Sequence, residues 1–430
     1  MTAVLGHAAL AGALVACVAA VCVSWVGGRR RRPALVAAGT WLLAGAAGLA
    51  VAAMAALAWA LLTGDFTIAY VAQATSRSMT WPYRLGSLWG GMEGSLLLWC
   101  SFLTGGAALA GRTLRRRAPE LHGTAQVVLG AVGAGALVLP LWLADPFARL
   151  ALPALDGGGL TPILEHPAML YHPPILYLGQ TALAIPFALT VAALAAGRLD
   201  GVWLALTRRF TLVAWVALSA GLVAGAHWAY QELGWGGIWA WDPVENAGLL
   251  PWLAATAFLH SALIAEHRSR RQASGAIGPW TAALAFAAFA LGLLGVYLTR
   301  SGATGSVHAF AEARAVGVAL LAGVAAVVVA GGLLLVRGRR RLSGLVATGT
   351  NGASSPLDGS PPGPAPHAPS ATGREAALLA NNALLIGCLL VVATGTLFPL
   401  VKEAFGGADS LVAPRYFATL AAPFGLAALA

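Results

Sequence analysis

Long apolar runs recur along the whole chain and limit its fold more than any other feature. Apolar residues make up 59% of the 430 residues, and charged residues only 10%. A helix of about 20 apolar residues crosses a hydrocarbon core of about 30 Å, and a helix also satisfies its own backbone hydrogen bonds there. The sequence therefore predicts an all-α, polytopic transmembrane helix bundle with ten complete spans, near 4–28, 34–62, 91–111, 121–144, 174–197, 210–229, 247–265, 277–299, 315–336 and 375–400. An eleventh run begins near residue 417, and with about 14 residues we expect it to form a partial span.

The formal charge of +10 is best explained by the topology of the chain in the membrane. Arginines gather between alternate pairs of spans, at 29–32, 112–117, 198–209, 268–271 and 337–341, and with Arg374 this side holds 19 of the 26 cationic residues. Cytoplasmic loops of membrane proteins carry such an excess of Lys and Arg. We therefore expect the N-terminus outside, with 63–90, 145–173, 230–246, 300–314 and 401–416 as outer loops. Because the basic residues follow the topology, the charge does not indicate a nucleic-acid partner.

Composition divides the chain into four parts. Residues 1–62 are predicted to form an N-terminal transmembrane hairpin, and 63–336 a core that carries the unusual outer loops. The proline-rich segment within 337–374 cannot bury apolar area, so it is expected to be a disordered inner linker. Residues 375–430 form an incomplete C-terminal transmembrane piece. The four cysteines lie inside spans and form no Cys-x-x-Cys motif, which argues against thiol redox chemistry.

A tryptophan-rich tract lies in the outer loop 230–246 and the start of the next span, within 230–252. Trp235, Trp239 and Trp241 lie close to three glycines and are followed by Asp242, Glu245 and Asn246. Glycine allows close backbone approach, while indole rings offer large flat faces. The tract therefore predicts a platform for a planar, hydrophobic ligand several rings wide, which the preceding Trp228 would extend. The alternative is an interfacial aromatic belt, although a belt needs no interspersed glycines.

Two histidines are predicted on the same outer face as this tract. His172 opens the fifth span in Tyr-His-Pro-Pro, and His308 follows the eighth span in Ser-Val-His-Ala-Phe. Imidazoles on opposite faces of a porphyrin give six-coordinate iron, so both are candidate ligands of an outer haem. Three outer arginines could pair with its propionates, namely Arg77, Arg84 and Arg300. His260 lies inside the seventh span, where an ionisable group usually has a function.

These motifs together resemble the large haem lyase subunit of cytochrome c maturation, the CcmF/NrfE type of tryptophan-rich haem-handling protein. The resemblance rests on Trp-Gly-Gly-Ile-Trp-Ala-Trp-Asp-Pro-Val-Glu-Asn, on the two histidine motifs, on Trp-Gly-Gly-Met-Glu-Gly-Ser-Leu-Leu-Leu-Trp at 89–99 and on Leu-Leu-Ala-Asn-Asn at 378–382. It runs from about residue 60 to the end. Met92 departs from the family, in which this position is often polar.

The resemblance implies a function and a location. Such a subunit takes haem b from a periplasmic haem chaperone and attaches it to Cys-x-x-Cys-His of apocytochrome c, in a bacterial inner membrane. Further partners would be maturation subunits that reduce or present the apocytochrome. His172 and His308 match the ligands of the outer haem, and His260 matches one axial ligand of a structural membrane haem. The second ligand of that haem is expected beyond Ala430, so the chain is expected to be C-terminally shortened.

Other functions remain open at this stage. A haem-delivery subunit that forms no thioether would also need the tryptophan tract, and a haem transporter would need more paired charges within the spans. No nucleophilic triad or hydrolytic metal site is evident, which disfavours a hydrolase, and no residue is assigned as catalytic. Asp242, Glu245 and Asn246 are better explained as capping groups of the seventh span than as catalysts, because carboxylates favour a helix N-terminus.

Overall fold

The computed structural model describes residues 1–234, 237–270, 277–304, 306, 313–350, 373–407 and 410–429. Within these residues it contains ten helices long and apolar enough to cross a membrane, and its only β pairing is one isolated bridge, between Ile68 and Arg149. The predicted all-α, polytopic transmembrane bundle is confirmed. Its helices are α1 Thr2–Arg29, α2 Pro33–Thr63, α3 Ala69–Ala74, α4 Trp81–Gly86, α5 Met92–Arg117, α6 Pro119–Val138, α7 His172–Ala182, α8 Ala184–Ala195, α9 Gly201–Glu232, α10 Pro243–Arg270, α11 Ile277–Arg300, α12 Arg314–Thr350, α13 Arg374–Ala404 and α14 Pro414–Leu429.

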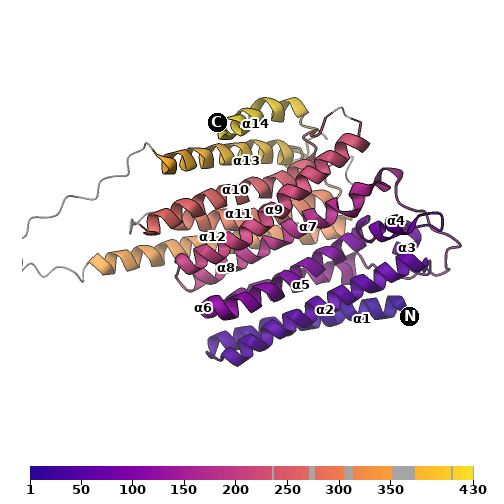
Figure 1. Ribbon diagram of the computed structural model, residues 1–430, viewed down its shortest axis with the longest axis horizontal. Helices are drawn as coiled ribbons and strands as arrows, with labels where there is room; N and C mark the ends of the chain where they lie inside the picture. The colour runs from indigo at the N-terminus through magenta and orange to yellow at the C-terminus, as the bar shows by residue number, and fades with distance from the viewer. Residues whose placement is uncertain are drawn as a thin grey trace, which may run out of the picture.

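The helices lie roughly side by side along the longest axis, so the bundle has two ends (Figure 1). One end carries the N-terminus, α3, α4 and the long connections around them, and we call it the loop end. The opposite end carries the arginine-rich helix termini, such as Arg29 of α1 and Arg117 of α5, and we call it the basic end. The expected sidedness of the connections therefore corresponds to two physical ends of the molecule.

The first two helices form the predicted hairpin. The buried residues of α1 are Ala3, Gly6, Leu10, Ala13, Cys17, Ala20, Ser24 and Gly27. Their spacing alternates between three and four, which is the pattern of two helices that pack along a narrow seam. Most are small, so the backbones of α1 and α2 approach closely, as is common in membranes. Both helices also pack on the next pair, α1 on α6 and α2 on α5, and each keeps an exposed face.

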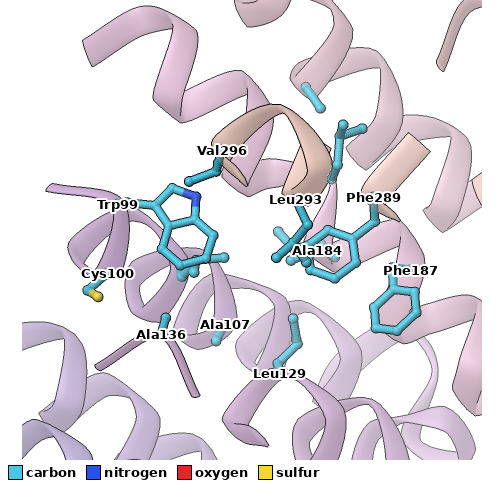
Figure 2. Close-up of a cluster of buried hydrophobic side chains, with 14 of the residues drawn as sticks. Trp99, Cys100, Ala107, Leu129, Ala136, Ala184, Phe187, Phe289, Leu293 and Val296 are labelled. Carbon is cyan, nitrogen blue, oxygen red and sulfur yellow. The ribbon is translucent and has the colours of Figure 1, made fainter. Parts of the chain in front are cut away.

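The central core lies where α5, α6, α8 and α11 meet (Figure 2). Trp99 and Cys100 of α5 contribute to it with Leu129 of α6. Phe187 of α8 stacks on Phe289 of α11 with ring centroids 4.7 Å apart. These helices surround the core with little polar surface, which makes them a rigid support for the side chains at the loop end.

Two spans that the sequence predicts as continuous are interrupted. The fifth span divides into α7 and α8 at Leu183, three residues before Pro186. Proline has no N–H and its ring collides with the carbonyl four residues earlier, here that of Ala182, so α7 ends there. Near its loop end the fourth span changes to a π-turn over Leu139–Leu143, which contains Pro140.

The predicted linker 337–374 needs correction at both of its ends. Helix α12 continues to Thr350, so 337–350 is helical, and α13 begins at Arg374. Arginine and leucine are good helix formers, and no proline, the residue most unfavourable to a helix, occurs before Pro356. The proline-rich remainder, 351–372, lies outside the described residues.

Candidate functional site

Two loops at the loop end hold the frame around the site. The N–H of Ala69 donates to Ala148 O (2.8 Å) and that of Leu150 to Thr67 O (3.0 Å). The Tyr70 hydroxyl donates to Ser87 O (2.6 Å), and burial raises the pKa of this phenol, so it remains a donor. These contacts tie 64–75 to 145–160 and hold the start of α5.

Arg77 and Arg84 belong to this frame. The Arg84 guanidinium donates to three backbone carbonyls, those of Met79 (3.0 Å), Leu62 (3.2 Å) and Arg77 (2.7 Å). Arg77 Nε donates to Leu155 O at 3.2 Å. Three arginines were predicted to pair with the haem propionates. Two of them, Arg77 and Arg84, instead donate hydrogen bonds to backbone carbonyls of the frame, and the third, Arg300, lies beside the candidate ligand His172.

His172 is the first residue of α7, and its ring lies against α9. Its Nδ1 lies 2.8 Å from Gly221 O. A carbonyl only accepts, so Nδ1 carries the hydrogen and, in the neutral ring, the lone pair lies on Nε2. Histidine ligands of metals commonly donate their other N–H to a carbonyl in this way, which orients the ring. The position of His172 thus matches the geometry of a metal ligand.

Two glycines of α9, one helical turn apart, make room for His172 and its helix. A Cβ at Gly221 would lie 2.8 Å from Leu176 Cα, and one at Gly225 would lie 2.5 Å from His172 Cε1. Any larger residue at either position would push α7 or the imidazole away. Sequence reasoning did not identify these glycines, because their importance depends on a helix 49 residues away from Gly221.

A pocket of about 130 Å³ lies beside His172. It is lined by Trp89, Met169 and Tyr177 together with the predicted Trp228 and Arg300. Arg300 donates a hydrogen bond to the Tyr177 hydroxyl, which holds the guanidinium near the imidazole. Trp228 is buried in an apolar cluster with Leu164 and Met169, so it supports the pocket wall. The pocket is smaller than the roughly 300–1,000 Å³ of typical ligand sites, so a macrocycle would have to lie over its mouth.

The tryptophan tract is held in place by the acidic residues that follow it. Glu245 Oε2 accepts from the N–H of Ala240 (2.9 Å) and of Asp242 (3.1 Å). Asp242 Oδ1 accepts from Val244 N (2.9 Å) and so caps α10. Asp242 therefore caps α10 as expected, and Glu245 also binds backbone N–H groups of the tract that precedes the helix. Trp241, between these residues, has a φ of 60°, a conformation that is rare for a non-glycine residue and needs such support.

The tryptophans of the tract have different surroundings. Trp241 stacks on Phe417 of α14 (centroids 5.5 Å apart, planes at 8°), and Trp239 meets Trp241 edge-on at 6.1 Å. The buried Trp239 Nε1 has no hydrogen-bond partner among the described residues. One face of Trp241 is thus covered by the protein, while Trp239 keeps an uncommitted donor. Trp235 lies outside the described residues.

His308 also lies outside the described residues, but its flanking chain reaches the tract. The hydroxyl of Ser306 donates to Asp242 Oδ1 at 2.8 Å. Ser306 precedes His308 by two residues, and Asp242 follows Trp241 directly. The structure therefore places Ser306 at the tract, on the same end as His172.

His260 lies near the basic end of α10, apart from the other predicted ligands. Its buried Nδ1 has no well-formed hydrogen bond among the described residues, although Asn381 of α13 lies close enough to interact with the ring. Next to it, Asn382 Nδ2 donates to Ser261 Oγ at 2.6 Å. Across the contact between α10 and α13, Asn381 therefore lies beside His260 and Asn382 beside Ser261.

We expect Gly225→Ala to impair the site without replacing His172, the predicted ligand. The added methyl group would overlap the imidazole of His172 and turn its Nε2, so haem affinity should fall by about 10–100-fold, the usual effect of disturbing the support of a metal ligand. Gly135→Ala is the matched control, because a Cβ there meets nothing within 4 Å. Spectroscopic haem titration of both purified variants measures the difference. Equal affinities would show that the groove of α9 does not position His172.

The chain is similar to known proteins along most of its length. Residues 89–308 match the model of the family described as "Cytochrome C assembly protein". The chain is 40% identical to "Cytochrome c-type biogenesis protein CcmF" of Pseudomonas aeruginosa over 381 residues, 88% of this chain and 54% of that protein. It is 38% identical to "Probable cytochrome c-type biogenesis protein NrfE" of Escherichia coli (strain K12) over 378 residues, 88% of this chain and 64% of that protein.

A solved structure is also similar. "Cytochrome c Heme Lyase CcmF" matches with a TM-score of 0.74 and 33% identity over 100% of this chain and 60% of that one. The chain spans about half to two thirds of the length of these relatives. The region matched by the family model contains His172, the tryptophan tract and Arg300.

Proposed function

The chain belongs to the cytochrome c assembly protein family, and we propose that it acts as a haem lyase subunit of cytochrome c biogenesis. The single observation that carries the proposal is the setting of His172. Its ring is oriented by the Gly221 carbonyl and lies beside a cationic side chain at the end that carries the tryptophan tract. In this role the chain would receive haem b from a haem chaperone and attach it to Cys-x-x-Cys-His of apocytochrome c.

Each part of the site has a distinct task in this proposal. His172 Nε2 would ligate the iron from one face and His308 from the other. The tract at 235–241 would bear the flat surface of the macrocycle, and Arg300 would pair with a propionate. The 130 Å³ pocket would receive only an edge of the haem, which leaves the vinyl groups exposed to a second protein.

The chemistry then depends mainly on positioning. Each thioether forms when a cysteine S–H adds across a vinyl C=C bond: the sulfur bonds to one carbon and the hydrogen ends on the other, with no net oxidation. The reaction needs thiols in the reduced state, which maturation subunits that reduce or present the apocytochrome would supply. Holding a vinyl carbon and a thiol together accounts for a large part of such catalysis, because it removes the entropic cost of their encounter.

His260 would be one of the residues that hold a resident membrane haem. Its Nδ1 is buried and lacks a well-formed hydrogen bond in the described chain, which suits a ring whose partner is not a protein side chain. Such a haem would supply one-electron chemistry when bound. Asn381 and Asn382 would restrict the ring from the side of α13.

The charge distribution supports an orientation for the chain in a bacterial inner membrane. The basic end would face the cytoplasm and the loop end the periplasm, with the N-terminus outside. The His172 site would then face the compartment in which a periplasmic chaperone and apocytochrome c are found.

Reconstitution tests the function. The purified protein is mixed with haem-loaded chaperone and reduced apocytochrome, and covalent haem is measured on denaturing gels and by the haemochrome spectrum. The proposal expects thioether-bound haem, which must disappear when both substrate cysteines are replaced by alanine. Haem exchange with the chaperone without covalent product would instead identify a haem-delivery subunit, the alternative function.

A further inference from the structure

A group of seven arginines lines two adjoining pockets at the basic end, far from the haem site. The first pocket, about 890 Å³, lies between the turn that joins α1 to α2 and the start of α6. The second, about 430 Å³, lies between α2 and the end of α5. Arg115 lines both. The seven are Arg29, Arg31, Arg32, Arg112, Arg115, Arg116 and Arg117.

This positive charge is not neutralised within the described part of the chain. None of the seven guanidinium groups forms an ion pair there, and the one carboxylate that lines the pockets, Glu120, lies 3.6 Å from Arg198 instead. Other arginines at the same end do meet carboxylates: Arg208 lies 3.3 Å from Glu266, and Arg268 binds Glu375. The orientation of the chain in the membrane explains why arginines gather at this end. It does not explain why these seven arginines, which line the two pockets, have no acidic partners among the described residues.

Two tryptophans indicate at which level of the bilayer the pockets lie. Trp25 and Trp41 are 51% and 63% exposed, although both belong to membrane helices. Arg29 lies over the Trp25 ring (4.4 Å) and Arg112 over the Trp41 ring (5.7 Å). Tryptophan is enriched at the level of lipid headgroups. The pockets therefore lie where the phosphates of one bilayer leaflet lie, with apolar helix faces next to them.

Buried polar side chains form part of the wall of the pockets. His122 Nε2 lies 3.0 Å from Thr40 Oγ1, and both residues are almost completely buried. His122 and Ser24 line the larger pocket and Thr40 the smaller one. His122 is thus a buried, hydrogen-bonded side chain that links α6 to α2. This contact holds α2 against α6 beside the pockets.

We propose that these pockets form a binding site for an anionic glycerophospholipid. Arginines bind phosphodiester oxygens with geometrically matched hydrogen bonds, and basic pockets between membrane helices bind acidic headgroups. Because Arg115 lines both pockets, a lipid with two phosphates, diphosphatidylglycerol, fits better than one with a single phosphate. Its acyl chains would lie along the exposed surface of α1 and α2, at residues such as Val18 and Trp41.

The test measures lipid retention by the purified, delipidated protein. Native mass spectrometry counts bound molecules after addition of diphosphatidylglycerol, phosphatidylglycerol or phosphatidylcholine. The expected order of affinity is the order named, and Arg115→Gln should weaken diphosphatidylglycerol binding by about fivefold, the usual contribution of one basic residue. Arg115→Lys should keep most of the affinity. Arg209→Gln, an exposed arginine on α9 outside both pockets, is the control of equal charge change and should bind as the wild type does.

Several outcomes would overturn the proposal. Equal retention of phosphatidylcholine would show that headgroup charge is not recognised, a result that depends on no variant. Equal losses in Arg115→Gln and Arg209→Gln would show attraction by net charge alone. Displacement of the lipid by millimolar inorganic phosphate would identify a site for the soluble anion.

Discussion

Replacing His172 with glycine is expected to abolish cytochrome c assembly. The substitution removes the proposed iron ligand, the imidazole ring. In the wild type this ring is positioned by its hydrogen bond to Gly221 O and by the space that Gly225 leaves beside it. Loss of a supporting group costs about 10–100-fold in metal affinity, so loss of the ligand itself should cost at least that much. The measurement is covalent haem on a reporter cytochrome, with protein amount checked in parallel. The same substitution at His308 should have a comparable effect, from its sequence position alone.

Added imidazole distinguishes loss of a ligand from loss of the fold. Free imidazole can occupy the space that the glycine leaves and ligate the iron, so assembly should partly return with His172→Gly. His227→Gly is the matched control, because this exposed histidine of α9 lies near the same end and should retain activity without imidazole. Wild-type assembly by His172→Gly would show that the residue is not a ligand.

Replacing Glu245 with alanine is expected to loosen the tryptophan tract and to release haem. The carboxylate accepts two backbone hydrogen bonds, from Ala240 and Asp242, on either side of Trp241 in its strained conformation. Hydrogen bonds to charged groups contribute about 1.5–3 kcal/mol each, and the orphaned N–H groups would add a desolvation cost. We therefore expect faster amide hydrogen exchange across 239–242 and weaker haem retention, both measured on the same preparation.

The carboxamide provides the control for Glu245. Glu245→Gln keeps an oxygen that can accept one or both bonds, so its exchange rates should lie between those of the wild type and of Glu245→Ala. If the amides of Ala240 and Asp242 exchange at the wild-type rate in Glu245→Ala, the tract does not depend on this carboxylate. Unchanged haem retention despite faster exchange would separate the tract from haem binding.

Sequence reasoning predicted the spans well and the local interruptions poorly. All ten spans follow from apolar length, because the bilayer imposes the same requirement on every helix. Pro140 and Pro186 were visible in the sequence, but a proline in a membrane helix can be tolerated, and whether a helix ends there depends on its neighbours. The extension of α12 to Thr350 was missed because the proline content of the following residues was attributed to the whole segment.

For the site residues, the sequence predicted at which end of the bundle each one lies, but it did not predict which residues each one contacts. The arginine distribution placed His172, Arg300 and the tryptophan tract on one side of the membrane. It could not show that the Arg84 guanidinium donates its hydrogen bonds to backbone carbonyls, whereas Arg300 donates to the Tyr177 hydroxyl. Nor could it show that Trp241 stacks on Phe417, 176 positions further along the chain. Each of these depends on packing between distant segments.

The sequence by itself determined the helical class, the number of spans and the chemical types available at the loop end, because each follows from local composition and the thickness of a bilayer. The tertiary structure alone decided the setting of each functional group. The Gly221 carbonyl selects the tautomer of His172 and Glu245 holds Trp241 at a positive φ, while the arginines around Arg115 have no carboxylate partners in the described part of the chain. The physical reason is that hydrogen-bond geometry and steric fit act over a few ångströms between residues far apart in the chain, and no local pattern records them.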